Sequence, residues 1–407
     1  MQKKLIVIGG GAAGFFCAVN AARLNKDLEV IILEKSSKLL SKVKVSGGGR
    51  CNVTHANFSI TSLVKNYPRG ANFLKKSFHL FNTQHTVDWF QERGVELKTE
   101  SDGRMFPVTN SSQTIIDCLI NEANKYKVQI KYNTAVTELV KENNLWVINT
   151  QKEEKINTNF ICIACGGFAK EESFQWIKNL GHSIELPVPS LFTFNIPNHS
   201  IHALMGLSVD NATIKVLGTK WQINGIVLIT HWGLSGPAIL KLSAFAAREL
   251  YEKKYDFSIV INWVSEYNET QLRDEWTYFR NEFSSAKMVN KNPFKIPNRL
   301  WIFLLNDSEI DQNVRWNEAT SKQQNKLISN LTSYVFYVKG KTTFKEEFVT
   351  AGGVKLHEID ANTMQSKVTE GIYFAGEIMD VDGVTGGFNF QNAWTTGFIA
   401  AQHIAKK

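Results

Sequence analysis

The hydrophobic pattern is strongest at the start of the chain, where it predicts a strand, a helix and a second strand. Residues 5–8 are all apolar and lead into a glycine-rich turn. A run typical of a helix continues to Leu24, and residues 28–33 are again mostly apolar. Short apolar strands separated by a helix are typical of the units that build parallel sheets. We therefore predict an α/β fold that begins with a strand–helix–strand unit.

The glycine turn carries the dinucleotide-binding spacing G-x-G-x-x-G, and an acidic residue ends the second strand. The first glycine permits a tight turn, the second lets a pyrophosphate approach, and the third lets the helix pack close to the strand. A carboxylate at the strand end can bind a ribose diol, and its charge would repel a 2′-phosphate. The pattern predicts FAD or NAD rather than NADP, and a turn that binds nothing is the alternative. The expected contacts are Gly9, Gly11, Ala12, Ala13, Gly14, Glu34 and Lys35.

Periodicity farther along the chain predicts more helices and strands. Residues 72–93 are expected to form one helix whose aromatic side chains belong to the core. Strands at 128–132, 135–140 and 145–150 are expected to form a β-meander. A buried strand at 160–167 then enters another glycine turn.

Composition changes near residue 188 and returns to its earlier character near residue 346. Residues 188–268 are rich in predicted strands, whereas residues 269–345 alternate helical runs with polar joints. Glycine-rich strands and a terminal helix follow. We therefore expect a discontinuous dinucleotide-binding domain of residues 1–187 and 346–407. A β-rich insertion on the substrate side and a mainly helical insertion would interrupt it.

A second glycine-rich stretch, Ser46-Gly-Gly-Gly-Arg-Cys-Asn-Val-Thr54, follows a basic span that includes Lys42. Successive glycines let backbone N–H groups crowd around a flat or anionic ligand. Arginine and asparagine then supply fixed donors. A flexible turn is the alternative, but flexible linkers rarely end in Arg-Cys-Asn. Ligand contacts are therefore expected at Lys42, Gly48, Gly49, Arg50, Cys51 and Asn52.

Three later stretches favour FAD over NAD. Residues 160–167 resemble the strand of two-dinucleotide flavoproteins that ends in Ala-Thr-Gly, with Cys165 in the Thr place. Residues 371–377 resemble their late strand ending in Gly-Asp, and Val136 occupies the place where they hold adenine. The turn into the last helix would present N–H groups to the flavin. The resemblance implies contacts at Val136, Ala164, Gly166, Gly167, Gly376, Glu377, Asp380, Gly387, Phe388, Asn389 and Gln391.

Four long motifs make this resemblance specific. They are the Ser46–Thr54 stretch, Thr230-His-Trp-Gly-Leu-Ser-Gly-Pro237, Thr350-Ala-Gly-Gly-Val354 and the run from Gly376 to Gln391. In this order they resemble the YhiN/BaiN-like flavoproteins, also known as the aminoacetone oxidase family or NAD(P)/FAD-dependent oxidoreductases. The resemblance implies FAD on a two-part Rossmann-like domain, interrupted by a β-barrel-like domain and a small helical domain. It does not indicate a substrate.

The expected chemistry is a two-electron transfer of hydride between flavin N5 and a small organic substrate. The sequence has no second G-x-G-x-x-G. NADH or NADPH would therefore dock transiently at the flavin, or oxygen would reoxidise it. The catalytic acid or base is unassigned; His231 and Cys51 are weak candidates, each with a structural role as the alternative. The nine histidines are scattered, which predicts no metal site.

Composition and charge bear on the compartment and the partners. The chain shows no signal peptide, the uncharged stretch 383–405 is too polar for a membrane, and five cysteines are typical of reduced thiols. These features predict a cytoplasmic protein without a membrane partner. The net charge of +8 keeps a second class open, a flavin-dependent nucleic-acid (tRNA) modifier or a flavin-bearing binding protein. The lack of an RNA module counts against that class, and the oligomeric state is left open.

Overall fold

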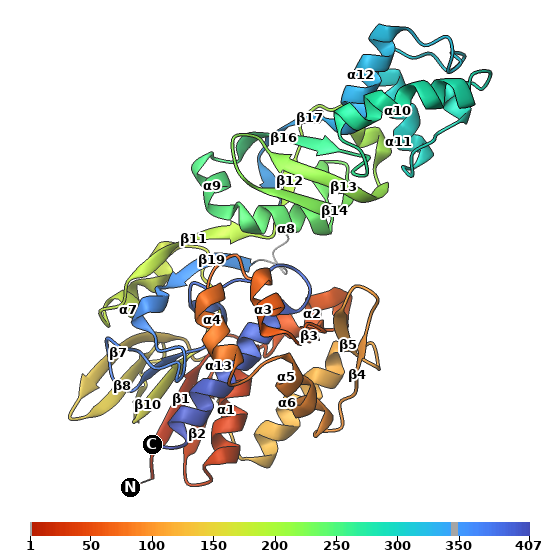
Figure 1. The fold of residues 1–407 in the computed structure, drawn as a ribbon. Helices are drawn as coiled ribbons and strands as arrows, with labels where there is room; N and C mark the ends of the chain where they lie inside the picture. Colours follow the sequence, from red (N-terminus) through yellow and green to blue (C-terminus); the bar gives the residue numbers. More distant parts are fainter. Residues whose placement is uncertain (1, 343–348) are drawn as a thin grey trace. The chain divides into compact units, whose positions relative to one another are not determined.

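The computed structural model describes residues 2–342 and 349–407 of the chain. The chain divides into two compact units, one made of residues 1–189 with 345–407 and the other of residues 190–344 (Figure 1). Within the described residues, none of the helices combines the length and the apolar character needed to cross a membrane.

A five-stranded parallel sheet forms the centre of the first unit and draws strands from both ends of the chain. Its order is β20 (Ile372–Phe374), β10 (Phe160–Ile163), β1 (Lys4–Ile8), β2 (Glu29–Leu33) and β6 (Gln129–Lys131). The helices α1 (Ala12–Leu24) and α13 (Phe388–Ile404) lie side by side (Figure 1). The inner strands are almost entirely buried, as expected of a parallel sheet covered on both faces. This sheet confirms the predicted Rossmann-like fold.

Smaller elements complete this unit. Two small antiparallel sheets are β3 (Thr54–His55) with β5 (Arg104–Pro107) and β4 (Leu97–Thr99), and β7 (Val136–Glu142) with β8 (Leu145–Thr150) and β9 (Lys155–Thr158). A third small sheet pairs β11 (Ile184–Ser190) with β19 (Val349–Val354). The other α-helices are α2 (Ser41–Gly49), α3 (Ile60–Leu63), α4 (Ala71–Phe78), α5 (Thr83–Gln91), α6 (Ser112–Lys125) and α7 (Gln175–Lys178).

Two expectations from the sequence are wrong in this unit. Residues 72–93 form two helices rather than one, because the side-chain oxygen of Asn82 accepts hydrogen bonds from the first backbone N–H groups of α5. The strand expected at 128–132 is β6, which pairs in parallel with β2 instead of joining the meander. The meander consists of β7, β8 and β9. The hydrophobic pattern of a strand does not indicate which strand it pairs with, and this explains the wrong assignment of residues 128–132 to the meander.

The second unit is built on a seven-stranded antiparallel sheet. Its order is β17 (Tyr334–Lys339), β16 (Asp256–Asn262), β13 (Ser208–Val216), β14 (Gln222–Ile229), β15 (Gly233–Ser235), β12 (Thr193–Asn195) and β18 (Lys341–Thr342). Gly340, with a φ of 90°, joins the two outermost strands. One run of chain therefore pairs with β16 on one side and with β12 on the other, so the sheet closes as in a barrel.

The helices of the second unit share a hydrophobic core with its strands. They are α8 (Pro237–Phe245), α9 (Ala247–Glu252), α10 (Glu269–Glu282), α11 (Asn298–Asp307) and α12 (Ser321–Thr332). Trp276 and Trp301 from the helices belong to the same buried cluster as Ile259 and Phe336 from the strands. Burying these indoles in one cluster couples the helices to the barrel.

A buried hydrogen-bonded network in the first unit ties the C-terminal segment to the chain before β11. Nδ1 of His182 lies 2.9 Å from Oε2 of Glu358, and Oγ of Ser366 lies 2.9 Å from the other ring nitrogen. Burial lowers the pKa of His182, so the neutral ring donates to Glu358 and accepts from Ser366. For Glu358, burial raises the pKa, but hydrogen bonds from Ser183 and His182 outweigh it and the pKa falls below its usual range.

Both pKa shifts predict that acid destabilises the fold. A group whose pKa is lowered by folding binds protons more readily in the unfolded chain. The free energy of unfolding should therefore decline as the pH falls below 6.5 for His182 and below 4.5 for Glu358. We expect Glu358→Gln to lower the free energy of unfolding at neutral pH by about 1–3 kcal/mol and to flatten the acid decline. Urea unfolding at neutral and acidic pH measures both effects. The exposed Glu370→Gln is the matched control, and equal losses in the two variants would contradict the role of this network.

Candidate functional site

The turn between β1 and α1 is packed tightly on one side and open on the other. A Cβ on Gly9 would lie 2.6 Å from the carbonyl oxygen of Ala164, and a Cβ on Gly14 would lie 1.9 Å from that of Gly9. A Cβ on Gly11 would instead have no atom within 4 Å. Because α1 begins at Ala12, this open side lies at a helix N-terminus, where backbone N–H groups favour a pyrophosphate.

The acidic residue after β2 is held beside this turn. Oε2 of Glu34 accepts a hydrogen bond from the Gly10 N–H at 2.9 Å, and Oε1 accepts hydrogen bonds from the N–H and the hydroxyl of Ser36, both at 2.8 Å. An ionised carboxylate has lone pairs beyond these three, which fits a ribose diol. The Thr134 N–H donates to the Glu34 carbonyl oxygen, which brings the start of β7, at Val136, toward Glu34.

The glycine turn after β10 lies on the same edge of the sheet. Gly166 has a φ of +77°, and a Cβ on it would meet no atom within 4 Å. A Cβ on Gly167 would lie 2.9 Å from the Cβ of Thr350. Lys35 Nζ lies 6.0 Å from the centroid of the Phe168 ring, so this lysine lies beside the same turn. Each of the two glycine turns therefore has one glycine, Gly11 or Gly166, that faces open space.

The Ser46–Thr54 stretch interrupts a helix. Within α2 the backbone angles are non-helical at Ser46, Gly47 and Gly48. A Cβ on Gly47 would lie 2.7 Å from the Phe106 ring, whereas a Cβ on Gly48 or Gly49 would meet no atom within 4 Å. The last two glycines thus present exposed backbone that a flat ligand can approach.

Arg50 is held by partners that sequence reasoning missed. Its Nη1 lies 2.6 Å from Oε1 of Glu100, and its guanidinium carbon lies 4.0 Å from the centroid of the Phe106 ring. These partners are about fifty positions away, and no local pattern indicates them. The guanidinium is therefore fixed in place by an ion pair and a cation–π contact.

The two residues after Arg50 are also fixed by the protein. Cys51 is fully buried, and burial raises the pKa of its thiol to about 12. A thiol that stays protonated is a poor nucleophile, which favours packing over catalysis at this position. The Asn52 amide, oriented to satisfy both neighbours, donates to the Thr54 carbonyl oxygen at 3.0 Å and accepts from the Gly387 N–H at 2.9 Å. Asn52 therefore links this stretch to the turn before α13.

Glu377 joins three segments of the first unit. It lies in the 3₁₀ turn Gly376–Ile378, where a Cβ on Gly376 would lie 2.9 Å from the Cβ of Ala13. Its Oε2 lies 2.7 Å from Nζ of Lys42, and its Oε1 accepts a hydrogen bond from the Thr350 N–H at 2.9 Å. The hydroxyl of Thr350 is buried and has no hydrogen-bond partner within the described residues. A cofactor hydroxyl or phosphate would satisfy such an orphaned group.

The turn into α13 is stabilised by its own side chains. Gly387 has a φ of +92° and caps the helix. The Asn389 amide accepts from the Gly383 N–H at 2.8 Å and donates to the Gly383 carbonyl oxygen at 2.9 Å. Gln391 is fully buried, and its Oε1 accepts hydrogen bonds from two threonine hydroxyls. A flavin at these positions would therefore contact backbone rather than these two amides.

The remaining residues expected near the flavin form the support of this turn. Phe388 is buried, its ring stacks on His55 at a centroid distance of 4.8 Å, and its carbonyl oxygen accepts a hydrogen bond from the Tyr67 hydroxyl at 2.7 Å. Nδ1 of His55 is buried without a hydrogen-bond partner in the described parts of the chain. The Asp380 N–H donates to the Val354 carbonyl oxygen at 3.0 Å. The structure thus brings the C-terminal motif onto the β3 strand.

His231 belongs to the second unit, whereas the residues above belong to the first. It is exposed on the loop between β14 and β15, and its ring lies 4.3 Å from that of Trp232 in an edge-to-face arrangement. Its catalytic role stays a prediction.

We call the turns with open glycines at Gly11, Gly48 and Gly166, together with Glu34 and Glu377, the cradle. The fold and the cradle together define a class of protein. A parallel sheet built from both chain ends, with open glycines at three turns and carboxylates at two of them, defines a two-part Rossmann domain of the flavoprotein type. The solved structure of 3-ketosteroid-delta4-(5alpha)-dehydrogenase from Rhodococcus jostii RHA1 has the same fold, with a TM-score of 0.52 at 12% identity. The match covers 100% of this chain and 98% of that one.

The chain belongs to the HI0933-like family, whose Rossmann domain matches residues 3–403. The 3-dehydro-bile acid delta(4,6)-reductase of Clostridium scindens is 27% identical over 415 residues and covers 100% of both chains. The ribosomal RNA dihydrouridine synthase of Escherichia coli is 28% identical and covers 98% of this chain and 97% of its own. These matches confirm the predicted family, and the chain is an FAD-dependent oxidoreductase whose substrate they leave unassigned.

A pair of glycine variants tests the cofactor cradle. Gly11→Ala adds a methyl group to the open side of the turn, so we expect a folded protein whose FAD affinity falls by at least about tenfold, because the methyl group would occupy pyrophosphate space. Gly14→Ala would collide with backbone and is expected to destabilise the fold itself. Flavin absorbance per polypeptide and thermal unfolding distinguish the two. Full flavin content in a folded Gly11→Ala protein would exclude this turn as the pyrophosphate site.

Proposed function

We propose that this protein uses NAD(P)H to reduce its flavin, and that the reduced flavin then reduces a carbon–carbon double bond conjugated with a carbonyl group. One observation carries the proposal. Two relatives that align over almost the whole chain are named for reductions of very different molecules, a 3-dehydro-bile acid and ribosomal RNA uridine. In both molecules the double bond is conjugated with a carbonyl, so the reaction type is the shared element.

The chemistry explains why one site can serve such substrates. Conjugation makes the far carbon of the double bond accept hydride, and the negative charge passes to the carbonyl oxygen. A proton from solvent then adds to the near carbon, which restores the carbonyl group and completes the gain of two hydrogens. The cofactor supplies the hydride, while the protein supplies orientation and electrostatics. The open glycines Gly48 and Gly49 and the fixed Arg50 are the groups we place at the ring end of the cofactor. Glu34 and the Gly11 turn are placed at its adenosine end.

We propose a uracil base of ribosomal RNA as the substrate. A second dihydrouridine synthase, from Haemophilus influenzae, is 28% identical and covers 99% of this chain and 98% of its own. The net charge of +8 supports an RNA partner, because phosphate contacts supply much of the affinity for nucleic acid. A cytoplasmic location, where both RNA and NAD(P)H occur, belongs to the same proposal. The small organic substrate expected from the sequence is the second candidate, and the bile acid reductase supports it.

An anaerobic reoxidation assay distinguishes these substrates. The protein is reduced with NADPH or NADH and then mixed with ribosomal RNA transcribed without modifications, or with a 3-oxo-Δ4 steroid. We expect RNA to restore the absorbance of oxidised flavin and to gain two hydrogens at one uridine, measured by mass spectrometry of its nucleosides. Reoxidation by the steroid alone would establish the second candidate. A flavin that only oxygen reoxidises would contradict the proposed reaction.

The interaction with RNA carries its own prediction. If RNA is the substrate, binding should weaken steeply as salt rises, because each phosphate contact releases counterions. The logarithm of the association constant should fall linearly with the logarithm of the salt concentration. Fluorescence anisotropy of a labelled RNA fragment measures this slope, with the flavin absorbance as a check that the protein stays intact. Binding that is insensitive to salt would argue against a phosphate-contacting substrate.

A further inference from the structure

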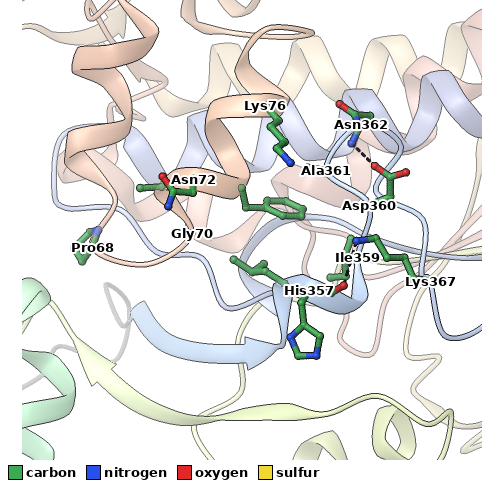
Figure 2. Close-up of a pocket in the computed structure, with 13 residues that line it drawn as sticks. Pro68, Gly70, Asn72, Lys76, His357, Ile359, Asp360, Ala361, Asn362 and Lys367 are labelled. Carbon is green, nitrogen blue, oxygen red and sulfur yellow. Dashed lines mark hydrogen bonds between the residues drawn. The ribbon is translucent and has the colours of Figure 1, made fainter.

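The first unit contains a cavity whose lining differs from the set of residues assigned to the flavin. It has a volume of about 590 Å³ and lies between the first turns of α4 and the segment 356–367 (Figure 2). None of the residues expected to bind FAD lines it. Cavities of this size accommodate small-molecule ligands. Its lining residues include Pro68, Gly70, Asn72, Phe73, Lys76, Leu356, Ile359, Asp360, Asn362 and Lys367.

Two lysines give the cavity a positive character. Lys76 extends from α4 toward the segment that carries Ala361, and Lys367 comes from the facing segment (Figure 2). Neither lysine forms an ion pair with a carboxylate within residues 2–342 and 349–407, although Lys367 Nζ donates to the His357 carbonyl oxygen at 3.2 Å. Asp360, the acidic residue in the lining, accepts a hydrogen bond from the Asn362 N–H at 2.8 Å. The balance of charge favours an anionic ligand.

The rest of the lining suits a flat ring. Phe73 and Leu356 are half-buried and Ile359 is buried, so these side chains form an apolar wall. Asn72 and Asn362 add exposed amides, which can donate and accept hydrogen bonds. Apolar surface for a heterocycle, amides for its edge and lysines for phosphate together match a nucleotide.

One wall of the cavity is built on the loop expected to face the flavin. A Cβ on Gly70 would lie 2.6 Å from Cγ2 of Val381, so the backbone of Gly70 packs closely against the Val381 side chain. Arg69 and Asp382 next to them form an isolated antiparallel β-bridge. Arg69 forms an ion pair with Asp382, which is fully buried, and the Val384 N–H donates to the Asn66 carbonyl oxygen at 2.9 Å. Residues 66–70 therefore connect the cavity to the chain that continues into the Gly387 turn.

We propose that this cavity binds the phosphorylated adenosine end of the NADPH or NADH that reduces the flavin. The inference rests on the proposed function, because it requires a nicotinamide reductant. In that step a hydride, carrying two electrons, leaves the dihydronicotinamide ring and reduces the flavin, and the oxidised nicotinamide dinucleotide departs. Lys76 and Lys367 bind the phosphates and hold the adenosine, while the ring of the other nucleotide reaches the flavin.

The test compares neighbouring lysines on one helix. Lys76→Ala and Lys367→Ala should each raise the dissociation constant of NADPH about tenfold, because each removes one charge-assisted contact to phosphate. Lys75→Ala, from an exposed lysine of α4 outside the cavity lining, should change it little. Stopped-flow reduction of the flavin-loaded protein gives the apparent dissociation constant and the limiting rate, and we expect the limiting rate to stay unchanged.

Calorimetric titration with two non-reducing probes, 2′,5′-ADP and ADP, gives binding without any redox step. Tighter binding of 2′,5′-ADP that is lost in Lys76→Ala and Lys367→Ala would assign NADPH, and equal binding of both probes with the same losses would assign NADH. Unchanged affinity in both cavity variants would overturn the proposal. The proposal would also be overturned if Lys76→Ala and Lys367→Ala weakened only the binding of RNA, since the cavity would then bind the substrate.

The proposed function can fail separately from this assignment. If NADPH and NADH do not bleach the flavin of the unaltered protein, both the reductant and this cavity assignment are overturned. In that case the flavin is reduced chemically with dithionite instead. Reoxidation of that flavin by RNA or by a 3-oxo-Δ4 steroid would preserve the proposed reduction of a conjugated double bond.

Discussion

The structure depends on contacts at the beginning of α1 that leave no room for a side chain. A Cβ on Gly14 would lie 1.9 Å from a carbonyl oxygen of the turn before the helix. A Cβ on Gly397 of α13 would lie 2.6 Å from the carbonyl oxygen of Ala13, and one on Gly376 would lie 2.9 Å from its Cβ. Segments from the two chain ends therefore meet on the same turn of one helix. This contact joins the two halves of the domain and also aims the free N–H groups of α1 into open space.

The parts of the site that the sequence predicts are those encoded in short stretches. Glycine spacing, a following helix and Glu34 lie within one local unit, so their geometry follows from the backbone they require. Pairings over long distances could not be predicted. Lys42 and Glu377 are 335 positions apart, and no periodicity relates them. The helix break at Asn82 is also a local signal, an N-cap followed by polar residues, but the apolar periodicity of the flanking residues concealed it.

Fold class was easier to predict than strand pairing. The parallel strands β1, β2 and β10 are nearly continuous apolar runs, which indicate a sheet buried on both faces. β6 is short and only partly buried, so its sequence is equally compatible with the edge of a parallel sheet and with a meander. In the second unit, closure of the barrel depends on Gly340, where one glycine turns a continuous stretch toward two different partners. A single residue of that kind has no distinctive sequence pattern.

The cradle and the turn into α13 contain two kinds of group, side-chain amides held by the protein's own hydrogen bonds and glycines that face open space. The side-chain amides of Asn389, Gln391 and Asn52 form hydrogen bonds with backbone groups and hydroxyls of the protein itself. These bonds fix the turns before a ligand binds. Gly11, Gly48 and Gly166 carry no side chain and face open space, so the ligand meets backbone already held in place. Such preorganisation lowers the entropy lost on binding. The same division would be compatible with relatives that are named for reactions on a bile acid and on ribosomal RNA. In the proposed site the rigid part would hold the cofactor, which carries the reaction, and would place few demands on the shape of the molecule that receives the hydride.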